Sequence, residues 1–154
     1  MAEIKVVTGW KMVKEQVKRG YSDLRWPDGN VIRMPIDAIT SQMLDAIDDE
    51  MKATQPQPKR IPVKGNDGRS TGKFVEDTED EVYKDALAKH NKLRSLKIIL
   101  TSIPKENRPE GDEAAQIKAL ESDLLIGHVT QLVKDILSIS NLNLDEAVSE
   151  AKND

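Results

Sequence analysis

The sequence predicts a mainly α-helical fold: a small helical domain with a short N-terminal β-hairpin and a long loop rich in proline and glycine. Apolar residues recur at helical spacing over much of the chain, which is the main sequence signal of amphipathic helices. Aromatic residues make up only 3% of the chain, so the core has to be aliphatic, which favours helices over a β-sandwich. Strand-like sequence is clearest in a short stretch between Tyr21 and Ile36.

Length and composition limit the domain count and the class of function. A chain of 154 residues suits one domain with a single core. The formal net charge of −4 supplies no positive field for gathering nucleic acid, which argues against DNA or RNA partners. The absence of cysteine excludes disulfides and thiolate zinc sites. We expect a single domain over 1–154, with a helix, a hairpin and a helix over 10–53, a loop over 54–77 and a helical C-terminal part over 79–152.

The N-terminal sequence and the length of the apolar stretches indicate where in the cell to expect this protein. The N-terminal region carries charges throughout and contains no uninterrupted apolar region of the signal-peptide kind. No stretch approaches the roughly 18–20 apolar residues that a membrane span requires. We therefore expect a cytoplasmic protein without a membrane partner.

A short amphipathic helix is predicted over 10–19, where Trp10, Val13 and Val17 share one face between lysines. A large indole ring near a short helix or a hairpin tip is either a buried anchor or an exposed binding residue. We expect burial for both Trp10 and Trp26.

A hairpin and a second helix follow. Two strand-like segments flank a turn at 27–30, which has proline and glycine at suitable positions. Asp37 can cap the next helix, which we expect to end near Ala53. Its apolar positions are Ile39, Met43, Leu44, Ile47 and Met51.

The segment 54–77 breaks all periodicity, because it contains three prolines and three glycines. We expect a long loop, whose inner part could form a loose second hairpin around Gly65–Gly68. Residues 68–74 faintly resemble a phosphate-binding loop, but only three residues separate the glycines, and Phe74 stands where Ser or Thr would hold magnesium. We therefore predict a flexible surface loop and no nucleotide site.

Two long helices are predicted in the C-terminal part, over 79–103 and 113–138. Each shows a run of apolar residues at helical spacing, and the second is the most hydrophobic stretch of the chain. The capping residues that we assign are Thr78 with Glu81, Asp112, and Asn143 with Glu146, the last pair for a final short helix.

No constellation of residues indicates an active site, a metal site or a cofactor. His90 and His128 lie on different predicted helices and lack a partner cysteine or the spacing of a zinc-binding helix. The acidic run at 76–81 lacks the ligand spacing and central glycine of a calcium loop, and helix capping explains it more simply. We predict a protein-interaction module, not an enzyme, without cofactor, metal or small-molecule substrate.

A broad apolar stripe on the two long C-terminal helices is the candidate working surface. Such a stripe either closes the core or forms a groove for a partner helix. We expect it to be core with an exposed remainder, and it makes self-association into a homo-oligomer plausible. The residues that we single out for protein interaction are Leu93, Leu96, Leu100, Leu120, Leu124, Leu125, Val129, Leu132 and Ile136.

The order of segments over 33–103 resembles one family of proteins. An apolar and acidic helix (MPIDAITSQMLDAIDDEMKA) precedes a proline-rich break (QPQPKRIPV) and a glycine-rich insert (KGNDGRSTGK). An acidic box (FVEDTEDEVY) and a new helix (YKDALAKHNKLRSL) follow. This arrangement is similar to that of the tail assembly chaperones and related small tail-morphogenesis proteins of long-tailed bacteriophages.

The resemblance implies a mainly helical protein of the host cytoplasm that shields the tape measure protein from aggregation and recruits tail tube subunits. Its partners would be these tail proteins or other copies of itself. The alternative is a structural component of the virion, such as a tail, neck or head-completion protein, for which the loop at 54–77 would order on a neighbouring subunit.

Overall fold

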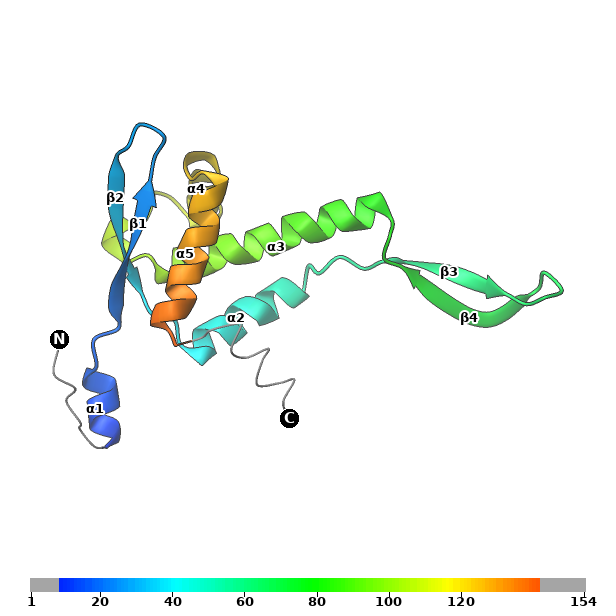
Figure 1. Ribbon diagram of the computed structural model, residues 1–154. Coiled ribbons are helices and arrows are strands. Elements are labelled where there is room, and N and C mark those ends of the chain that lie inside the picture. The colour runs from blue at the N-terminus through cyan, green and yellow to red at the C-terminus, as the bar shows by residue number, and fades with distance from the viewer. Residues whose placement is uncertain (1–8, 142–154) are drawn as a thin grey trace.

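The computed structural model describes residues 9–141, and this part of the chain has a mixed α/β fold. It is 51% helical and 21% strand and contains two small antiparallel sheets. The prediction of a mainly α fold with a single hairpin is therefore wrong. In chain order (Figure 1) the elements are α1 (Trp10–Glu15), β1 (Arg19–Arg25), β2 (Val31–Asp37), α2 (Ser41–Lys52), β3 (Lys59–Lys64), β4 (Ser70–Asp77), α3 (Glu81–Ser102), a 3₁₀ turn (Lys105–Asn107), α4 (Glu113–Asp123) and α5 (Ile126–Ile139).

The main difference from the prediction concerns the segment 54–77: the loose inner hairpin expected around Gly65–Gly68 extends over most of this segment as the antiparallel hairpin β3–β4, and a long loop is not present there. The prolines that break helical periodicity do not exclude a strand here. Both strands of a two-stranded ribbon are edge strands, and an edge strand tolerates the missing N–H of Pro62. Gly68, with a φ of 77°, supplies the left-handed backbone of the turn between the strands.

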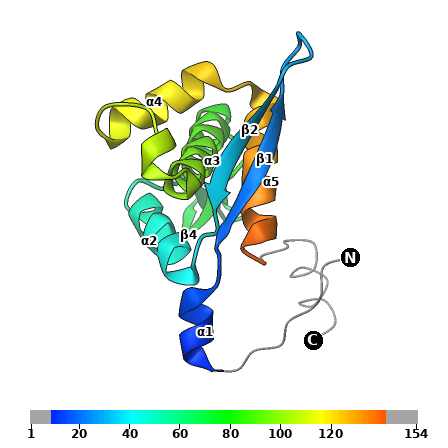
Figure 2. The same cartoon turned by 90° about the vertical axis from the view of Figure 1, so that its left-hand side faces the viewer.

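Helix α3 is the central element of the body. Its C-terminal half packs against α2, α4 and α5, and α5 lies along the β1–β2 sheet (Figures 1 and 2). Its N-terminal half runs out of the body toward the β3–β4 hairpin, which projects beyond it (Figure 1). The chain is therefore a body with a protruding arm.

The hydrophobic core is aliphatic, as the composition indicates. Burying each of these side chains contributes about 1.5–3 kcal/mol to folding. The core draws on β1 and β2 and on α2, α3, α4 and α5. Its members are Leu24, Ile36, Ile39, Ile47, Met51, Leu96, Ile98, Ile99, Leu100, Ile103, Leu120, Leu132 and Ile136.

The N-terminal hairpin β1–β2 is confirmed. Its turn is closed by a hydrogen bond from the Trp26 backbone N–H to the Asn30 carbonyl at 2.9 Å. Ser22 and Leu24 on β1 point inward and are buried, while the alternate residues face outward. This period of two places one face of the hairpin on α5 and leaves the other to solvent.

Helix α1 begins at Trp10 and α2 ends at Lys52, next to Ala53, as predicted, but the end of α1 and the cap of α2 differ from the prediction. Helix α1 stops at Glu15, so Val17 lies outside it. Helix α2 is capped by Thr40, whose Oγ1 accepts the N–H of Met43 at 3.3 Å. Asp37, the predicted cap, is instead the last residue of β2.

Helix α3 forms as predicted over most of 79–103, but its N-cap is Asp80, whose side chain makes no capping hydrogen bond. Thr78 and Glu81 therefore do not form the predicted capping box. At the other end, the Arg108 guanidinium covers the last carbonyls, and its Nε donates to the Ile103 oxygen at 2.7 Å. Cations favour helix C-termini in this way because the unpaired carbonyls carry partial negative charge.

The predicted long helix over 113–138 is two helices. The backbone is extended at Leu124 and Leu125, between α4 and α5. Asp112 caps α4 as predicted, since its Oδ1 accepts the N–H of Ala115 at 2.9 Å. The final capped helix that the sequence predicts lies outside the described residues.

Candidate protein interfaces

Most of the apolar stripe singled out in the sequence closes the core. A buried leucine or isoleucine is not accessible to a partner without unfolding part of the body, so the accessible remainder is small. Leu96, Leu100, Leu120, Leu132 and Ile136 are buried; Leu93, Leu124 and Val129 are partly buried and pack against the core; Leu125 is exposed.

His90, His128 and Trp26 contribute to packing between elements, whereas Trp10 is exposed. His90 Nε2 lies 2.8 Å from the Met51 carbonyl oxygen and so connects α3 to the end of α2. Trp26 is partly buried against His128, with ring centroids 4.4 Å apart in an edge-to-face arrangement. Trp10 is 71% exposed, so its predicted burial is wrong.

A polar seam holds α5 against β1. His128 Nε2 lies 2.6 Å from the Arg25 carbonyl oxygen, and Gln131 Nε2 donates to the Asp23 carbonyl at 2.6 Å. One turn further on, Ser22 Oγ donates to the Asp135 carboxylate at 2.6 Å. The spacing of 128, 131 and 135 places these three side chains on one face of the helix. The seam fixes the start of α5 beside the turn of the β1–β2 hairpin.

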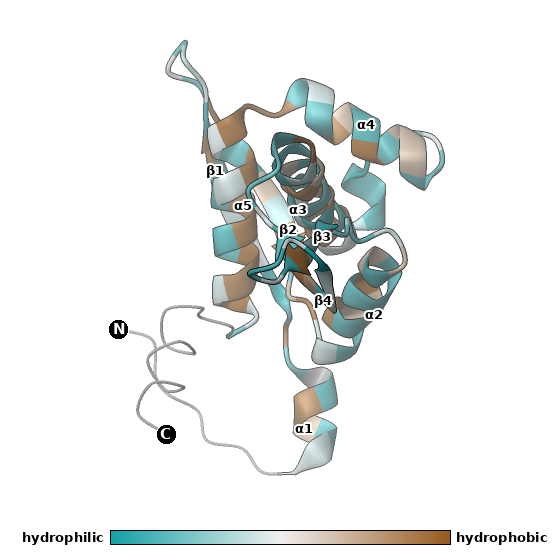
Figure 3. Cartoon of the chain, turned by 90° about the vertical axis from the view of Figure 1, so that its right-hand side faces the viewer, coloured by the Kyte–Doolittle hydropathy of each residue, from teal (hydrophilic) through white to brown (hydrophobic). Residues whose placement is uncertain are grey.

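Exposed apolar side chains lie on both elements near this seam, at the start of α5 and at the start of β2. Ile126 is 90% exposed, and Leu125 beside it is 43% exposed. Val31 and Ile32 at the start of β2 are also exposed and border, with Trp26, a shallow hollow. In Figure 3 brown and teal segments alternate along the α5 ribbon, as expected of a helix with one apolar face. We call Trp26, Ile32, Leu125 and Ile126 the apical patch; Val31 lies opposite Arg25, on the other face of the hairpin.

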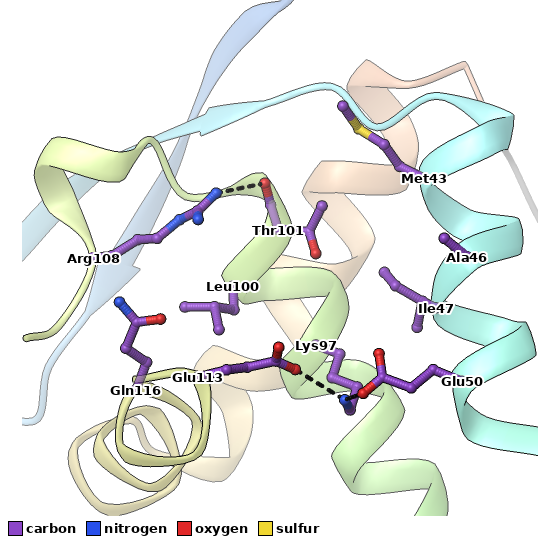
Figure 4. Close-up of a pocket in the computed structure, with 10 residues that line it drawn as sticks. All are labelled: Met43, Ala46, Ile47, Glu50, Lys97, Leu100, Thr101, Arg108, Glu113 and Gln116. Atoms are coloured by element: carbon purple, nitrogen blue, oxygen red, sulfur yellow. Dashed lines mark hydrogen bonds and ion pairs between the residues drawn. The ribbon is translucent and has the colours of Figure 1, made fainter. Parts of the chain in front are cut away.

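A second hollow lies between α2, α3 and α4, and Lys97 crosses its floor (Figure 4). Its Nζ donates to the Glu113 carboxylate at 2.9 Å and to that of Glu50. Burial alone would lower the pKa of Lys97, but the hydrogen bonds from its ammonium to Glu50 and Glu113, with their charges, more than offset that effect and raise it. A lysine held as a cation between two carboxylates joins three helices and is a poor base or nucleophile.

The described residues 9–141 contain no group of histidine, aspartate and glutamate side chains arranged to hold a metal ion. In the same part of the chain, no helix is both long and apolar enough to cross a membrane. Comparison with protein-family models, curated proteins and solved structures finds no match. The function of this chain has to be argued from its own surfaces.

The β3–β4 hairpin is the other accessible surface, and we call it the arm. Ile61 lies opposite Val75 on one face of the arm, and Pro62 lies opposite Phe74 on the other face. The side chains of Ile61, Phe74 and Val75 are about half exposed or more. A two-stranded hairpin with apolar residues on both faces is marginally stable in water, which favours burial against a partner.

The sequence does not predict the apical patch, and it predicts the arm only as a loose hairpin around Gly65–Gly68 within a loop; the reasons differ. Ile32 and Ile126 carry no local signal, because only the packing of α5 on the hairpin places their two elements side by side. The arm does carry one: Lys59–Lys64 and Ser70–Asp77 flank a glycine turn and hold β-branched and aromatic residues. The three prolines and three glycines outweighed that signal in the prediction.

Proposed function

We propose that this chain is a tail assembly chaperone-like protein of a long-tailed bacteriophage, which binds and shields tail proteins during morphogenesis. The client that the resemblance over 33–103 suggests is the tape measure protein, and the place of action would be the host cytoplasm. The physical requirement for such a role is an accessible apolar surface on a stable body, and no catalytic residue is needed.

The observation that carries this proposal is the apical patch. Ile126, at 90% exposure, follows a leucine that is also exposed, on the first turn of a helix fixed by hydrogen bonds to β1. Apolar side chains on a rigid element gain free energy by burying an apolar client segment and lose little conformational entropy. Helical client segments would present apolar residues at matching spacing.

A structural virion component is the second candidate, and the arm favours it. A hairpin that projects from the body with apolar residues on both faces is suited to a permanent contact with a neighbouring subunit. A chaperone needs only transient contacts. The two candidates therefore differ in whether the chain stays in the finished particle.

Co-expression with the tape measure protein tests the client surface. Leu125→Ser with Ile126→Ser should leave the body folded and cause the client to precipitate. Val82→Ser is the matched control, because Val82 is 71% exposed on α3, outside the apical patch. Equal client solubility with the patch variant and with wild type would contradict the proposed client surface.

Mass spectrometry of finished virions and of the infected-cell lysate separates the two candidates. Presence in the lysate with absence from virions would support a transient assembly factor. Abundance in virions comparable to that of known structural subunits would remove the chaperone and leave the structural component.

A further inference from the structure

The arm has one protected edge and one open edge. Strand β3 carries Pro62 and an irregularity of the pairing between Pro62 and Lys64. Its charged residues are all basic: Lys59, Arg60 and Lys64. Proline, irregular pairing and lysine on an edge strand prevent a further strand from adding to it. Strand β4 is eight residues long, contains no proline and carries charges of both signs. The edge of β4 is therefore the one at which another strand can add.

The backbone of β4 presents hydrogen-bonding groups at that edge. Pro62 has no N–H, and a proline fits a paired strand where its nitrogen faces away from the neighbouring strand. Phe74, which lies opposite Pro62, therefore also directs its N–H and C=O away from β3. Glu76, two residues further on, has the same orientation. Within the described residues no other strand pairs with β4, and Figure 1 shows the arm projecting clear of the body.

We infer that two copies of this chain pair through their β4 strands, antiparallel and with Val75 of one copy opposite Val75 of the other. The two hairpins then form one four-stranded sheet in the order β3–β4–β4–β3. Phe74 and Glu76 of opposite copies exchange backbone hydrogen bonds. A two-stranded hairpin is marginally stable in water, whereas three or more strands with an apolar face are stable. Because both copies use the same surface, the assembly is a closed dimer.

One face of this sheet combines an apolar row with two ion pairs. Alternate residues of a strand share a face, which places Lys73, Val75 and Asp77 together. Ile61 lies opposite Val75 and joins them. Across the dimer axis the row consists of Ile61 and Val75, followed by the same two residues of the second copy in reverse order. On either side of the row, Lys73 lies opposite Asp77 of the other copy, and opposite charges stabilise such a cross-strand pair.

Lys73 and Asp77 are available for this pairing. Neither forms an ion pair with a described residue. Asp77 accepts the N–H of Glu79 through Oδ1 at 3.2 Å, which leaves Oδ2 for the lysine of the other copy. A register centred on Phe74 would instead place Lys73 opposite Val75, and one centred on Lys73 would place two lysines opposite each other. The charges of β4 therefore select the register centred on Val75.

The opposite face brings the two phenylalanines together. Phe74 is 58% exposed in the single copy and lies opposite Pro62 of its own β3. In the Val75 register the two Phe74 residues are diagonal neighbours across the axis, about 7–8 Å apart, within reach of aromatic side chains. An unrelated extended strand would supply the backbone bonds but neither this ring nor the matched charges. A second copy is therefore the partner that fits the edge, and this pairing does not depend on the proposed phage function.

Charge exchange in the full chain tests the pairing by sedimentation velocity over a range of concentrations. The wild type should be a dimer. Lys73→Glu creates two acidic pairs across the axis and Asp77→Lys creates two basic pairs, so each variant alone should weaken the dimer about tenfold or more. An equal mixture of the two variants should recover the dimer, because every cross-strand pair then joins opposite charges. Lys64→Glu is the matched control: the same charge change on β3 should leave the dimer unchanged.

An introduced cysteine tests the register directly, because the chain contains none. Val75→Cys brings two thiols to the dimer axis, where opposite Cα atoms are about 4.5–5.5 Å apart, within the range of a disulfide. Ile61→Cys is the control on the same face with similar exposure, 49% against 56%. It lies three strand spacings, roughly 14 Å, from its counterpart, beyond disulfide reach. Mild oxidation should therefore cross-link the Val75 variant and leave the Ile61 variant without a cross-link on a non-reducing gel.

Circular dichroism shows whether each variant is folded, and the cysteine pair still decides should a charge variant fail to fold. Cross-linking at Val75 alone, together with recovery in the mixture, would support pairing in this register. A monomeric wild type, equal cross-linking of the two cysteine variants, or a mixture of charge variants that stays monomeric would overturn the inference. An unchanged dimer in the Lys73→Glu variant would place the contact on another surface and would overturn it as well.

Discussion

His128 and Arg25 are 103 residues apart in the sequence, yet the Nε2 of the imidazole lies 2.6 Å from the Arg25 carbonyl oxygen. The other ring nitrogen, Nδ1, accepts the backbone N–H of Leu125 at 3.1 Å. An acceptor nitrogen carries no proton, so this pair of bonds fixes the neutral tautomer with the proton on Nε2. One buried side chain thus caps α5 and joins that helix to β1.

The substitution His128→Ala removes both bonds and leaves a cavity beside Trp26. We expect a loss of about 2–4 kcal/mol in the free energy of unfolding, because an uncapped helix end and an unpaired carbonyl add to the lost packing. Urea denaturation measures this change in the free energy of unfolding. Thr130→Ala is the control, since Thr130 is exposed and bonds only within its helix. A loss below about 0.5 kcal/mol would mean that the seam contributes little.

The apolar stripe divides into core and surface, and paired substitutions should reveal that division. Leu132 is fully buried, so Leu132→Ala should cost about 2–5 kcal/mol. Ile126 is exposed, so Ile126→Ala should stay within about 0.5 kcal/mol of wild type. Thermal denaturation of both variants provides the comparison, and similar losses would contradict this placement of α5.

The predictable parts of this fold are those set by neighbouring residues. The turn between β1 and β2 and the cap at Asp112 were predicted, because each depends on a few residues close in sequence. The break between α4 and α5 was not predicted, since the apolar period continues through Leu124 and Leu125. His128 stabilises the start of α5 after the break, and its partner on β1 is remote in sequence.

The same limit applies to the candidate site, because contacts between residues remote in sequence decide which of its residues are exposed. Periodicity identifies Leu132 and Ile136 as one apolar face but does not say whether β1 and α3 cover it. Only the tertiary structure separates these buried residues from the exposed Ile126. The arm is predicted only as a loose hairpin within a loop for a local reason, because the prolines indicate a break although an edge strand accepts proline.

Lys97 should make stability fall at alkaline pH. Its pKa is raised in the folded state, so its contribution is complete below the unfolded pKa and is lost as pH rises through the folded value. The variant Lys97→Met removes that dependence. The difference in unfolding free energy between wild type and variant, measured from pH 8 to above the usual lysine pKa of about 10.4, should therefore shrink. A difference independent of pH would show that Lys97 acts only through packing.

Asp23, on the outer face of the hairpin, should make stability fall at acidic pH. A hydrogen bond from Arg33 at 2.8 Å lowers the pKa of the Asp23 carboxyl. A lowered pKa stabilises the fold above the unfolded value and loses that effect as pH falls through the folded one. The contribution is small because the pair is exposed. Arg33→Gln should flatten the acid limb of the wild-type stability curve below about pH 4, and an unchanged curve would contradict this role.

The arm should be dispensable for the stability of the body. Its extensive contacts are those between β3 and β4, and the described core draws no residue from it. Replacing residues 60–76 with a short glycine-serine turn keeps Lys59 near Asp77, as in the native register, and leaves α2 and α3 joined. We expect the free energy of unfolding to change by less than about 1 kcal/mol, because the strands form a separate cooperative unit. Hydrogen exchange adds a second measurement: the amides of α3 and α5 should keep their protection in the shortened chain. Loss of that protection would mean that the arm contributes to the stability of the body and that the two fold as one cooperative unit.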